Sequence, residues 1–215
     1  MFTGIIQHVG RVIGASETAS GRRLRVEIGP LAARVAPGGS IAVDGACLTA
    51  AAVSGAAADL DAVPETLGRT TLGDLRPGGA VNLELPLAAG APLDGHVVQG
   101  HVDGVAEVVA VDRAGAGHVL RLSAAADLTG QMVPKGSVAL AGVSLTLVDV
   151  AAGRFSTALV PETLARTTLG ELRPGGRVNV ELDVLGKYVR GYVAGLLGRP
   201  GEGLTAEKLR ESGFV

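Results

Sequence analysis

Cys47 and Ser144 are the residues of this chain best suited to chemistry, because they occupy one position in two copies of a pattern. Both stand two residues after a glycine and directly before Leu-Thr, in Gly-Ala-Cys-Leu-Thr (45–49) and Gly-Val-Ser-Leu-Thr (142–146). A thiol or a hydroxyl becomes a nucleophile when a neighbouring cation or base activates it. A buried cysteine that acts only as a small apolar side chain is the alternative. No histidine pairs with Cys47 by spacing, so the sequence leaves both interpretations open.

The two positions correspond because the chain repeats itself. Residues 39–85 and 136–182 align without a gap at an offset of 97 and agree at 26 of 47 positions. From 63–85 against 160–182 the agreement is 19 of 23. Upstream the match continues at an offset of 96. This period lies far above the roughly 20–50 residues of solenoid repeats, so each copy is predicted to be a self-contained domain.

Positions at which the copies differ mark where the two domains can act differently. The differences that involve reactive or charged groups include Cys47 against Ser144, Ile5 against His101, Gly38 against Lys135, Asp44 against Ala141, and Pro86 against Asp183. We interpret the Asp44 difference as drift. Shared residues, such as the two Pro-Glu-Thr triplets and the arginines at 69 and 166, are interpreted mainly as requirements of the fold.

The elements that must position these residues are predicted to be short strands. Residues 22–28 alternate with period two, and 40–45, 80–85, 137–142 and 177–182 form matching strands. Arg-Pro-Gly-Gly turns precede the strands at 80 and 177, where proline presets φ and glycine supplies positive φ. Many short strands with glycine-rich turns favour an all-β barrel, which leaves no free edge.

Five segments interrupt the strand pattern or follow it. Each Pro-Glu-Thr-Leu run (64–67 and 161–164) is predicted to form one helical turn, and residues 86–93 are predicted to be the linker between the domains. From Gly186 the apolar residues adopt helical spacing, and Arg199-Pro200-Gly201 is predicted to end that helix. A second short helix is expected at 204–212.

Composition excludes several classes of function. The 215 residues carry a net charge of −2 with no basic block, which argues against nucleic acid and anionic membranes as partners. Three Phe, two Tyr and no Trp leave few platforms for stacking bases. One cysteine and four scattered histidines give no metal cluster, and no glycine-rich nucleotide motif occurs. The absence of a signal peptide or an apolar span predicts the cytoplasm.

Taken together in their order, the motifs resemble the riboflavin synthases of the trimeric alpha-chain type, a lumazine-binding double-barrel family. The resemblance covers essentially the whole chain. It rests on Met1-Phe2-Thr3-Gly4-Ile5, Asp44-Gly45-Ala46-Cys47-Leu48-Thr49, Gly142-Val143-Ser144-Leu145-Thr146, Gly100-His101-Val102, and both Pro-Glu-Thr-Leu…Arg-Thr-Thr-Leu-Gly runs. One departure is Ala141, where the family commonly has an aspartate; this is expected to weaken a turn contact at most.

The resemblance implies a fold and a reaction. It implies two homologous six-stranded Greek-key closed barrels, over residues 1–93 and 94–185, followed by a helical tail, 186–215, that assembles a homotrimer. Two molecules of 6,7-dimethyl-8-ribityllumazine would dismutate, without metal or redox cofactor, to riboflavin and 5-amino-6-(D-ribitylamino)uracil. The active site would lie between the N-barrel of one subunit and the C-barrel of its neighbour. An association with lumazine synthase is a further partner to consider.

The resemblance also implies site residues. The residues expected to take part in catalysis are Cys47, His101, Ser144, Thr146, Lys135, Asp183 and Phe2. Those expected to bind substrate are Gly4, Ile5, Ile6, Cys47, Leu48, Thr49, Asp61, Ala62, Val63, Pro64, Glu65, Thr66, Gly100, His101, Val102, Lys135, Ser144, Leu145, Thr146, Ala158, Leu159, Val160, Pro161, Glu162 and Thr163.

The hypothesis divides the roles between the barrels. His101, Ser144 and Thr146 of the C-barrel would handle the 7-methyl proton, and Cys47 of the N-barrel would contact the other lumazine. Glu65 and Glu162 would accept hydrogen bonds from ribityl hydroxyls. The main alternative is a lumazine- or flavin-binding antenna protein without catalysis. A flavin module of a reductase fits less well, because no nicotinamide-binding domain follows.

Overall fold

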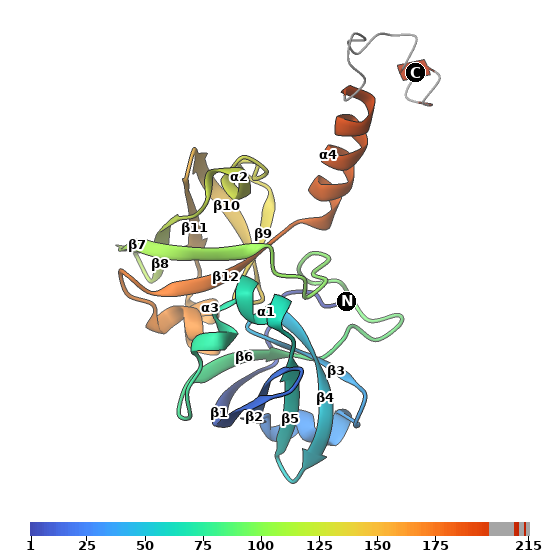
Figure 1. Ribbon diagram of the computed structural model, residues 1–215. Helices are drawn as coiled ribbons and strands as arrows, with labels where there is room; N and C mark the ends of the chain where they lie inside the picture. The colour runs from blue at the N-terminus through green and yellow to red at the C-terminus, as the bar shows by residue number, and fades with distance from the viewer. Residues whose placement is uncertain (198–208, 211–212, 214–215) are drawn as a thin grey trace. The chain divides into compact units, whose positions relative to one another are not determined.

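Among the residues that the computed structural model describes (1–197, 209–210 and 213), twelve strands close into two barrels. The strands of the first barrel are β1 (His8–Thr18), β2 (Gly21–Glu27), β3 (Ser40–Val43), β4 (Ala46–Ser54), β5 (Ala57–Ala62) and β6 (Ala80–Glu84). Those of the second are β7 (Gly104–Ala114), β8 (Gly117–Ser123), β9 (Ser137–Leu140), β10 (Val143–Ala151), β11 (Arg154–Leu159) and β12 (Arg177–Leu182). All pairings are antiparallel, and the cyclic order β1-β2-β5-β4-β3-β6 recurs as β7-β8-β11-β10-β9-β12, which confirms the predicted fold class (Figure 1).

Strand alternation explains why each barrel fills its own interior. In β2 the buried side chains Leu24 and Val26 alternate with exposed arginines, as the period-two pattern predicts. Each barrel holds a separate apolar core, built from equivalent positions of the two copies. The Arg-Pro-Gly-Gly turns form as predicted, with Gly78 at φ +96° and Gly175 at φ +85°.

Short helices cap the barrels. The predicted helical turns are six-residue helices, α1 (Pro64–Arg69) and α3 (Pro161–Arg166), each with proline at its first turn. A further short helix, α2 (Ala126–Thr129), and 3₁₀ turns at Gly29–Arg34, Thr71–Asp74 and Thr168–Glu171 complete the connections.

The tail is a compact unit of its own, from Val184 onward. Its helix α4 (Val184–Leu197) confirms the predicted helical segment. Leu185, Tyr188 and Val189 are each about two-thirds exposed (66%, 70% and 65%). The ending expected at Arg199-Pro200-Gly201 falls outside the described residues, as does nearly all of the helix expected at 204–212. No helix in the described part of the chain is long and apolar enough to cross a membrane.

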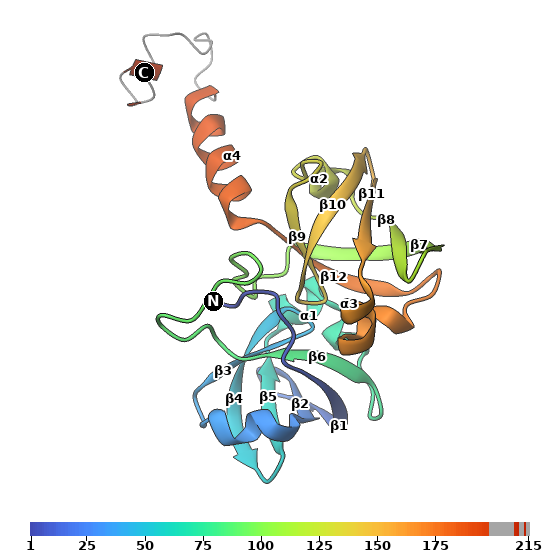
Figure 2. The same cartoon turned by 180° about the vertical axis from the view of Figure 1, so that it is seen from behind.

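Two extended arms connect the barrels by crossing between them. One arm precedes β1 (residues 1–7) and the other precedes β7 (residues 98–103). They pair where Phe2 and Val98 exchange backbone hydrogen bonds of 2.6 and 3.1 Å, and both views show the N-terminus beside the segment that joins the barrels (Figures 1 and 2). Each arm is attached to its own barrel yet reaches the other.

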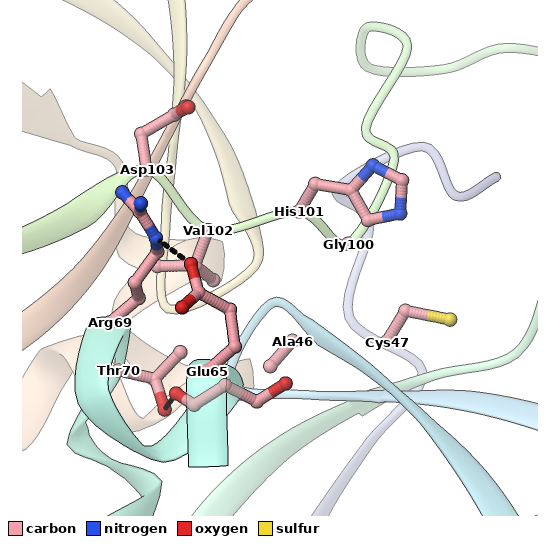
Figure 3. Close-up of a pocket in the computed structure, with 10 residues that line it drawn as sticks. Ala46, Cys47, Glu65, Arg69, Thr70, Gly100, His101, Val102 and Asp103 are labelled. Carbon is pink, nitrogen blue, oxygen red and sulfur yellow. Dashed lines mark hydrogen bonds and ion pairs between the residues drawn. The ribbon is translucent and has the colours of Figure 1, made fainter. Parts of the chain in front are cut away.

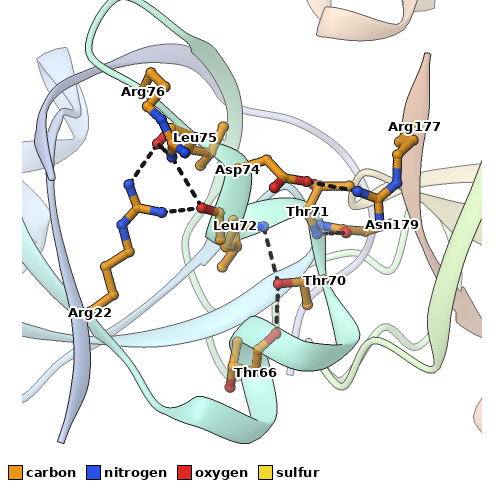
Figure 4. A network of polar contacts seen from close by, with 11 residues as sticks. Arg22, Thr66, Thr70, Thr71, Leu72, Asp74, Leu75, Arg76, Arg177 and Asn179 are labelled. Carbon is orange, nitrogen blue, oxygen red and sulfur yellow. Dashed lines mark hydrogen bonds and ion pairs between the residues drawn. The ribbon is translucent and has the colours of Figure 1, made fainter. Parts of the chain in front are cut away.

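Side-chain amides also join the barrels. Asn82 and Asn179, equivalent residues that are each 1% exposed, bond to backbone groups of the opposite barrel. Figure 4 shows Asn179 beside Thr71, with the exposed ion pair of Asp74 and Arg177 next to it. Nearby, burial raises the pKa of Asp44 to about 7, while the N–H of Asn82 donates to its carboxylate (2.8 Å). This turn contact is the one that Ala141 cannot make.

Candidate functional site

A cavity of about 330 Å³ lies where the second arm passes the first barrel. Cys47 of β4 lines it, together with residues of α1 and of the arm. The full lining is Ala46, Cys47, Glu65, Thr66, Arg69, Thr70, Gly100, His101, Val102 and Asp103 (Figure 3). The cavity therefore combines residues that are far apart in sequence, and four of its ten lining residues, 100–103, come from the second arm.

Glycine lets the arm approach Cys47 closely. Gly100 has φ +84°, and a Cβ placed there would lie 2.4 Å from the Cβ of Cys47. The carbonyl of Gly100 accepts the N–H of Cys47 at 2.9 Å. Glu181 of β12 fixes the same arm from behind, because its carboxylate accepts the N–H groups of Gln99 (2.6 Å) and Gly100 (2.9 Å). A larger side chain at position 100 could not occupy this backbone.

Charged groups line one side of the cavity. Glu65 and Arg69 form an ion pair one helical turn apart in α1. The hydrogen bond to Glu65 raises the pKa of Arg69, and the nearby Asp103 carboxylate adds to this effect. Because both pair members are more than half exposed, they contribute little to stability and remain able to bind a ligand's hydroxyl groups.

The first arm makes the equivalent arrangement at Ser144. The carbonyl of Gly4 accepts the N–H of Ser144 (2.8 Å). Gly4 has φ +76°, and a Cβ placed there would lie 2.6 Å from that of Ser144. The carboxylate of Glu84 accepts N–H groups of Thr3 and Gly4. In α3, Glu162 pairs with Arg166 as Glu65 does with Arg69. The two copies therefore build one kind of site twice, each completed by the other copy's arm.

The structure places His101 differently from the hypothesis. His101 was grouped with Ser144 and Thr146 of the second barrel, but it lines the cavity with Cys47 of the first. The cause is the exchange of the arms, which carries residues 98–103 across to the other barrel. Cys47 and His101 thus belong to one cavity within a single chain.

The other expected residues divide by burial. Leu48, Ala62, Leu145 and Leu159 are buried, and Phe2, 1% exposed, lies in a small apolar cluster against which Cys47 packs. Those at the surface or half-buried are Ile5, Ile6, Thr49, Asp61, Val63, Pro64, Lys135, Thr146, Ala158, Val160, Pro161, Thr163 and Asp183. Asp61 pairs with Arg23 on the outside of the first barrel. Within the described residues, no group of three or more histidine, cysteine or acidic side chains could hold a metal.

Sequence reasoning missed His96. Its Nδ1 lies 2.7 Å from Oγ of Ser144, and the residue is 8% exposed. A sequence signal exists, because Gly-His occurs twice, at 95–96 and at 100–101. Only the second belongs to the motifs that carry the resemblance.

Lys135 occupies a turn in the left-handed region, where the first copy has Gly38. Its φ is +67°, and its N–H bonds the carbonyl of Leu147 just as that of Gly38 bonds Ala50. This backbone costs a residue other than glycine about 1–2 kcal/mol. We expect Lys135→Gly to raise the free energy of unfolding by about 1 kcal/mol, measured by urea titration, while lowering turnover. Gly38→Lys, at the equivalent turn of the first barrel, is the control and should destabilise the protein without lowering turnover. Unchanged turnover in Lys135→Gly would contradict a role for the ammonium group.

Comparisons with known proteins agree with the duplication. The model of a family described as lumazine binding domain matches residues 3–86 and 99–183. A riboflavin synthase from Mycobacterium tuberculosis is 42% identical over 193 residues, which cover 88% of this chain and 96% of that protein. One from Chlamydia pneumoniae is 39% identical over 203 residues, covering 94% and 100%. The crystal structure of LumP complexed with riboflavin matches with a TM-score of 0.78 and 26% identity, covering 85% of this chain and 99% of that one.

Proposed function

The chain belongs to the lumazine binding domain family, and we propose that it is a riboflavin synthase. In the reaction, two molecules of 6,7-dimethyl-8-ribityllumazine dismutate. One molecule transfers a four-carbon unit to the other, which becomes riboflavin, and the remainder leaves as 5-amino-6-(D-ribitylamino)uracil. All atoms of the products come from the two substrate molecules.

The observation that carries this proposal is a site made twice with different reactive groups. A dismutation needs two pockets of similar shape for the same molecule, used in different roles. The cavity at Cys47 and the equivalent position at Ser144 share the glycine approach and the Glu–Arg pair. The two sites differ in their reactive group, which is a thiol at Cys47 and a hydroxyl at Ser144. Holding two flat rings in reacting orientation replaces an encounter in solution and accounts for much of the expected rate.

The antenna alternative is not favoured. Relatives that carry the name riboflavin synthase match at 34–42% identity across nearly their whole length, whereas LumP matches at 26%. This chain also retains Cys47, His101, Ser144 and Lys135 together.

We also propose that the chain assembles into a homotrimer. The exposed apolar side chains of α4 support a homotrimer formed through that helix, since such a stripe is stabilised by burial against another chain. The reacting pair of pockets would then lie between the first barrel of one subunit and the second barrel of its neighbour.

The cytoplasm is the proposed location, in keeping with the free thiol of Cys47. We also propose that the chain associates with lumazine synthase.

The proposal is tested by mixing the purified chain with the lumazine and following riboflavin absorbance. We expect riboflavin to form, and we expect Cys47→Ser and His101→Gln each to lower turnover by about 10- to 30-fold, as loss of one hydrogen-bonding or proton-transfer group does. His118→Gln, in β8, is the matched control and should leave turnover unchanged. Lumazine binding without any flavin would favour the antenna function, and full turnover in both variants would contradict the assigned roles.

A further inference from the structure

Asp103 brings a second carboxylate to the guanidinium group of Arg69 in the cavity at Cys47. Glu65 pairs with Arg69 from within α1, and the field of Asp103 further favours the charged form of that arginine. Figure 3 shows these three side chains on one side of the cavity, across from Cys47. Two negative charges against one positive charge leave this side of the cavity with one net negative charge.

The equivalent position of the first arm shows that the arm itself does not require this charge. Gln7 follows Gly4 by three residues, as Asp103 follows Gly100. The amide oxygen of Gln7 accepts the N–H of Leu85 at 3.3 Å, and the carboxylate of Asp103 accepts that of Leu182 at 2.8 Å. The backbone N–H groups at both positions donate to equivalent carbonyls of β6 and β12, at 2.9 Å each. A neutral amide therefore suffices to join the arm to its strand, and what Asp103 adds is charge.

The site at Ser144 has a different charge balance. Glu162 and Arg166 repeat the ion pair in α3, and Gln7 adds no charge to it. Lys135 and Asp183, which differ from the first copy, carry opposite charges. The charged groups that distinguish the two sites therefore sum to zero at Ser144, whereas Asp103 leaves one negative charge at Cys47.

This difference bears on the end of the ribityl chain. A terminal hydroxyl donates a hydrogen bond to a carboxylate, so a wall that contains Glu65 and Asp103 suits it. A terminal phosphate would instead carry about 1.5–2 negative charges at neutral pH and would be repelled by the same wall. Arg69 does not offset this repulsion, because two carboxylates already act on it.

We propose that Asp103 is a specificity-determining residue, which makes the pocket at Cys47 accept ribityl ligands that end in a hydroxyl and reject those that end in a phosphate. The inference rests on the proposed function, which places a ribityl chain against Glu65. The pocket at Ser144 takes both kinds of ligand. Phosphoryl transfer to the terminal hydroxyl of the released flavin would therefore keep that product from competing with substrate at Cys47.

The experiment titrates the full-length protein with riboflavin and, separately, with riboflavin 5′-phosphate, and follows the fluorescence of the flavin. The wild type should bind riboflavin at two sites. It should bind the phosphate at one site of similar affinity and at a second that is about tenfold weaker, because repulsion by one charge in a partly solvated pocket is worth about that factor. Both titrations are repeated at high salt, which should reduce the difference by screening the charge.

Two variants exchange the charge between the pockets. Asp103→Asn keeps an oxygen that can accept the N–H of Leu182 but removes the charge, so its weak phosphate site should strengthen about tenfold while riboflavin affinity changes less than about threefold. Gln7→Glu is the reciprocal change and should weaken the strong phosphate site by a similar factor. Asp112→Asn is the matched control, since it removes a carboxylate from an exposed ion pair with Arg121 outside the cavity, and it should alter neither titration.

The outcomes separate this inference from the proposed function. Equal affinity of both wild-type sites for the phosphate, or a weak site that Asp103→Asn leaves unchanged, would overturn the role of Asp103. A difference between the ligands that persists at high salt would assign the selection to shape rather than charge and would also overturn it. A wild-type protein that shows the expected binding pattern but forms no riboflavin from the lumazine would overturn the proposed function and leave the selection by charge in place.

Discussion

Replacing Glu181 with alanine should disable the cavity at Cys47, although Glu181 belongs to the other barrel. Its carboxylate, in a residue 2% exposed, accepts the N–H groups of Gln99 and Gly100. That arm in turn presents the carbonyl of Gly100 to Cys47 and carries His101 into the cavity. Without the carboxylate, the buried N–H of Gly100 and the half-buried N–H of Gln99 lose a charge-assisted partner, at a cost of about 2–4 kcal/mol. The arm then no longer forms the wall of the cavity.

The expected result has two parts. Lumazine stoichiometry, measured by fluorescence titration, should fall from two sites per chain to one, and riboflavin formation should fall on the order of a hundred-fold or more, because small misplacements at a reacting site cost that much. Glu84→Ala is the reciprocal change and should remove the Ser144 site instead. Glu107→Ala, an exposed carboxylate in β7, serves as the control. Two intact sites in Glu181→Ala would show that the arm does not depend on this anchor.

The barrels could be predicted from sequence because their information is local and repeated. Alternation in β2 and the Arg-Pro-Gly-Gly turns specify strands and their connections without reference to distant residues. The duplication then doubles every such signal. The Pro-Glu-Thr-Leu runs similarly carry their own helix start, proline at the first turn.

The exchange of the arms could not be predicted in this way. It is fixed by backbone carbonyls of Gly4 and Gly100, and any residue type supplies a carbonyl. The carboxylates that anchor the arms, Glu84 and Glu181, stand in regular strands with nothing in the sequence to mark this role, and the chain has 33 glycines. Spacing alone therefore groups His101 with Ser144, although it lines the cavity at Cys47, and does not single out His96 beside Gly95. Predictions based on spacing fail where residues meet through an irregular segment.

A single buried amide should hold much of the contact between the barrels. The Nδ2 of Asn179 donates to the carbonyl of Asp44 (2.9 Å), and its Oδ1 accepts the N–H of Thr71 (2.7 Å). Asn82 makes the reciprocal bonds, to the carbonyl of Ala141 (3.0 Å) and from the N–H of Thr168 (2.8 Å). Because the pairing is the same in both directions, each asparagine satisfies two buried backbone groups of the opposite barrel.

We expect Asn179→Ala to lower the free energy of unfolding by about 3–4 kcal/mol, since it leaves a carbonyl and an N–H buried without partners and creates a small void. For a chain of this size the melting temperature should fall by roughly 6–16 °C, as measured by calorimetry. Arg177→Ala is the matched control at the same contact. It removes an ion pair with Asp74 of 2.7 Å whose side chains are 53% and 69% exposed, and should cost at most about 0.5 kcal/mol.

Asn179→Asp distinguishes hydrogen bonding from volume, because aspartate has the same shape. One of its oxygens can still accept from Thr71, but the other faces the carbonyl of Asp44 without a proton to donate. A buried, half-satisfied charge is worse than a void, so this variant should be at least as unstable as Asn179→Ala at neutral pH. It should recover part of the loss as pH falls and the carboxyl takes up a proton. If Asn179→Asp matched the wild type, the barrels would be held together by apolar packing of the arms rather than by these amides.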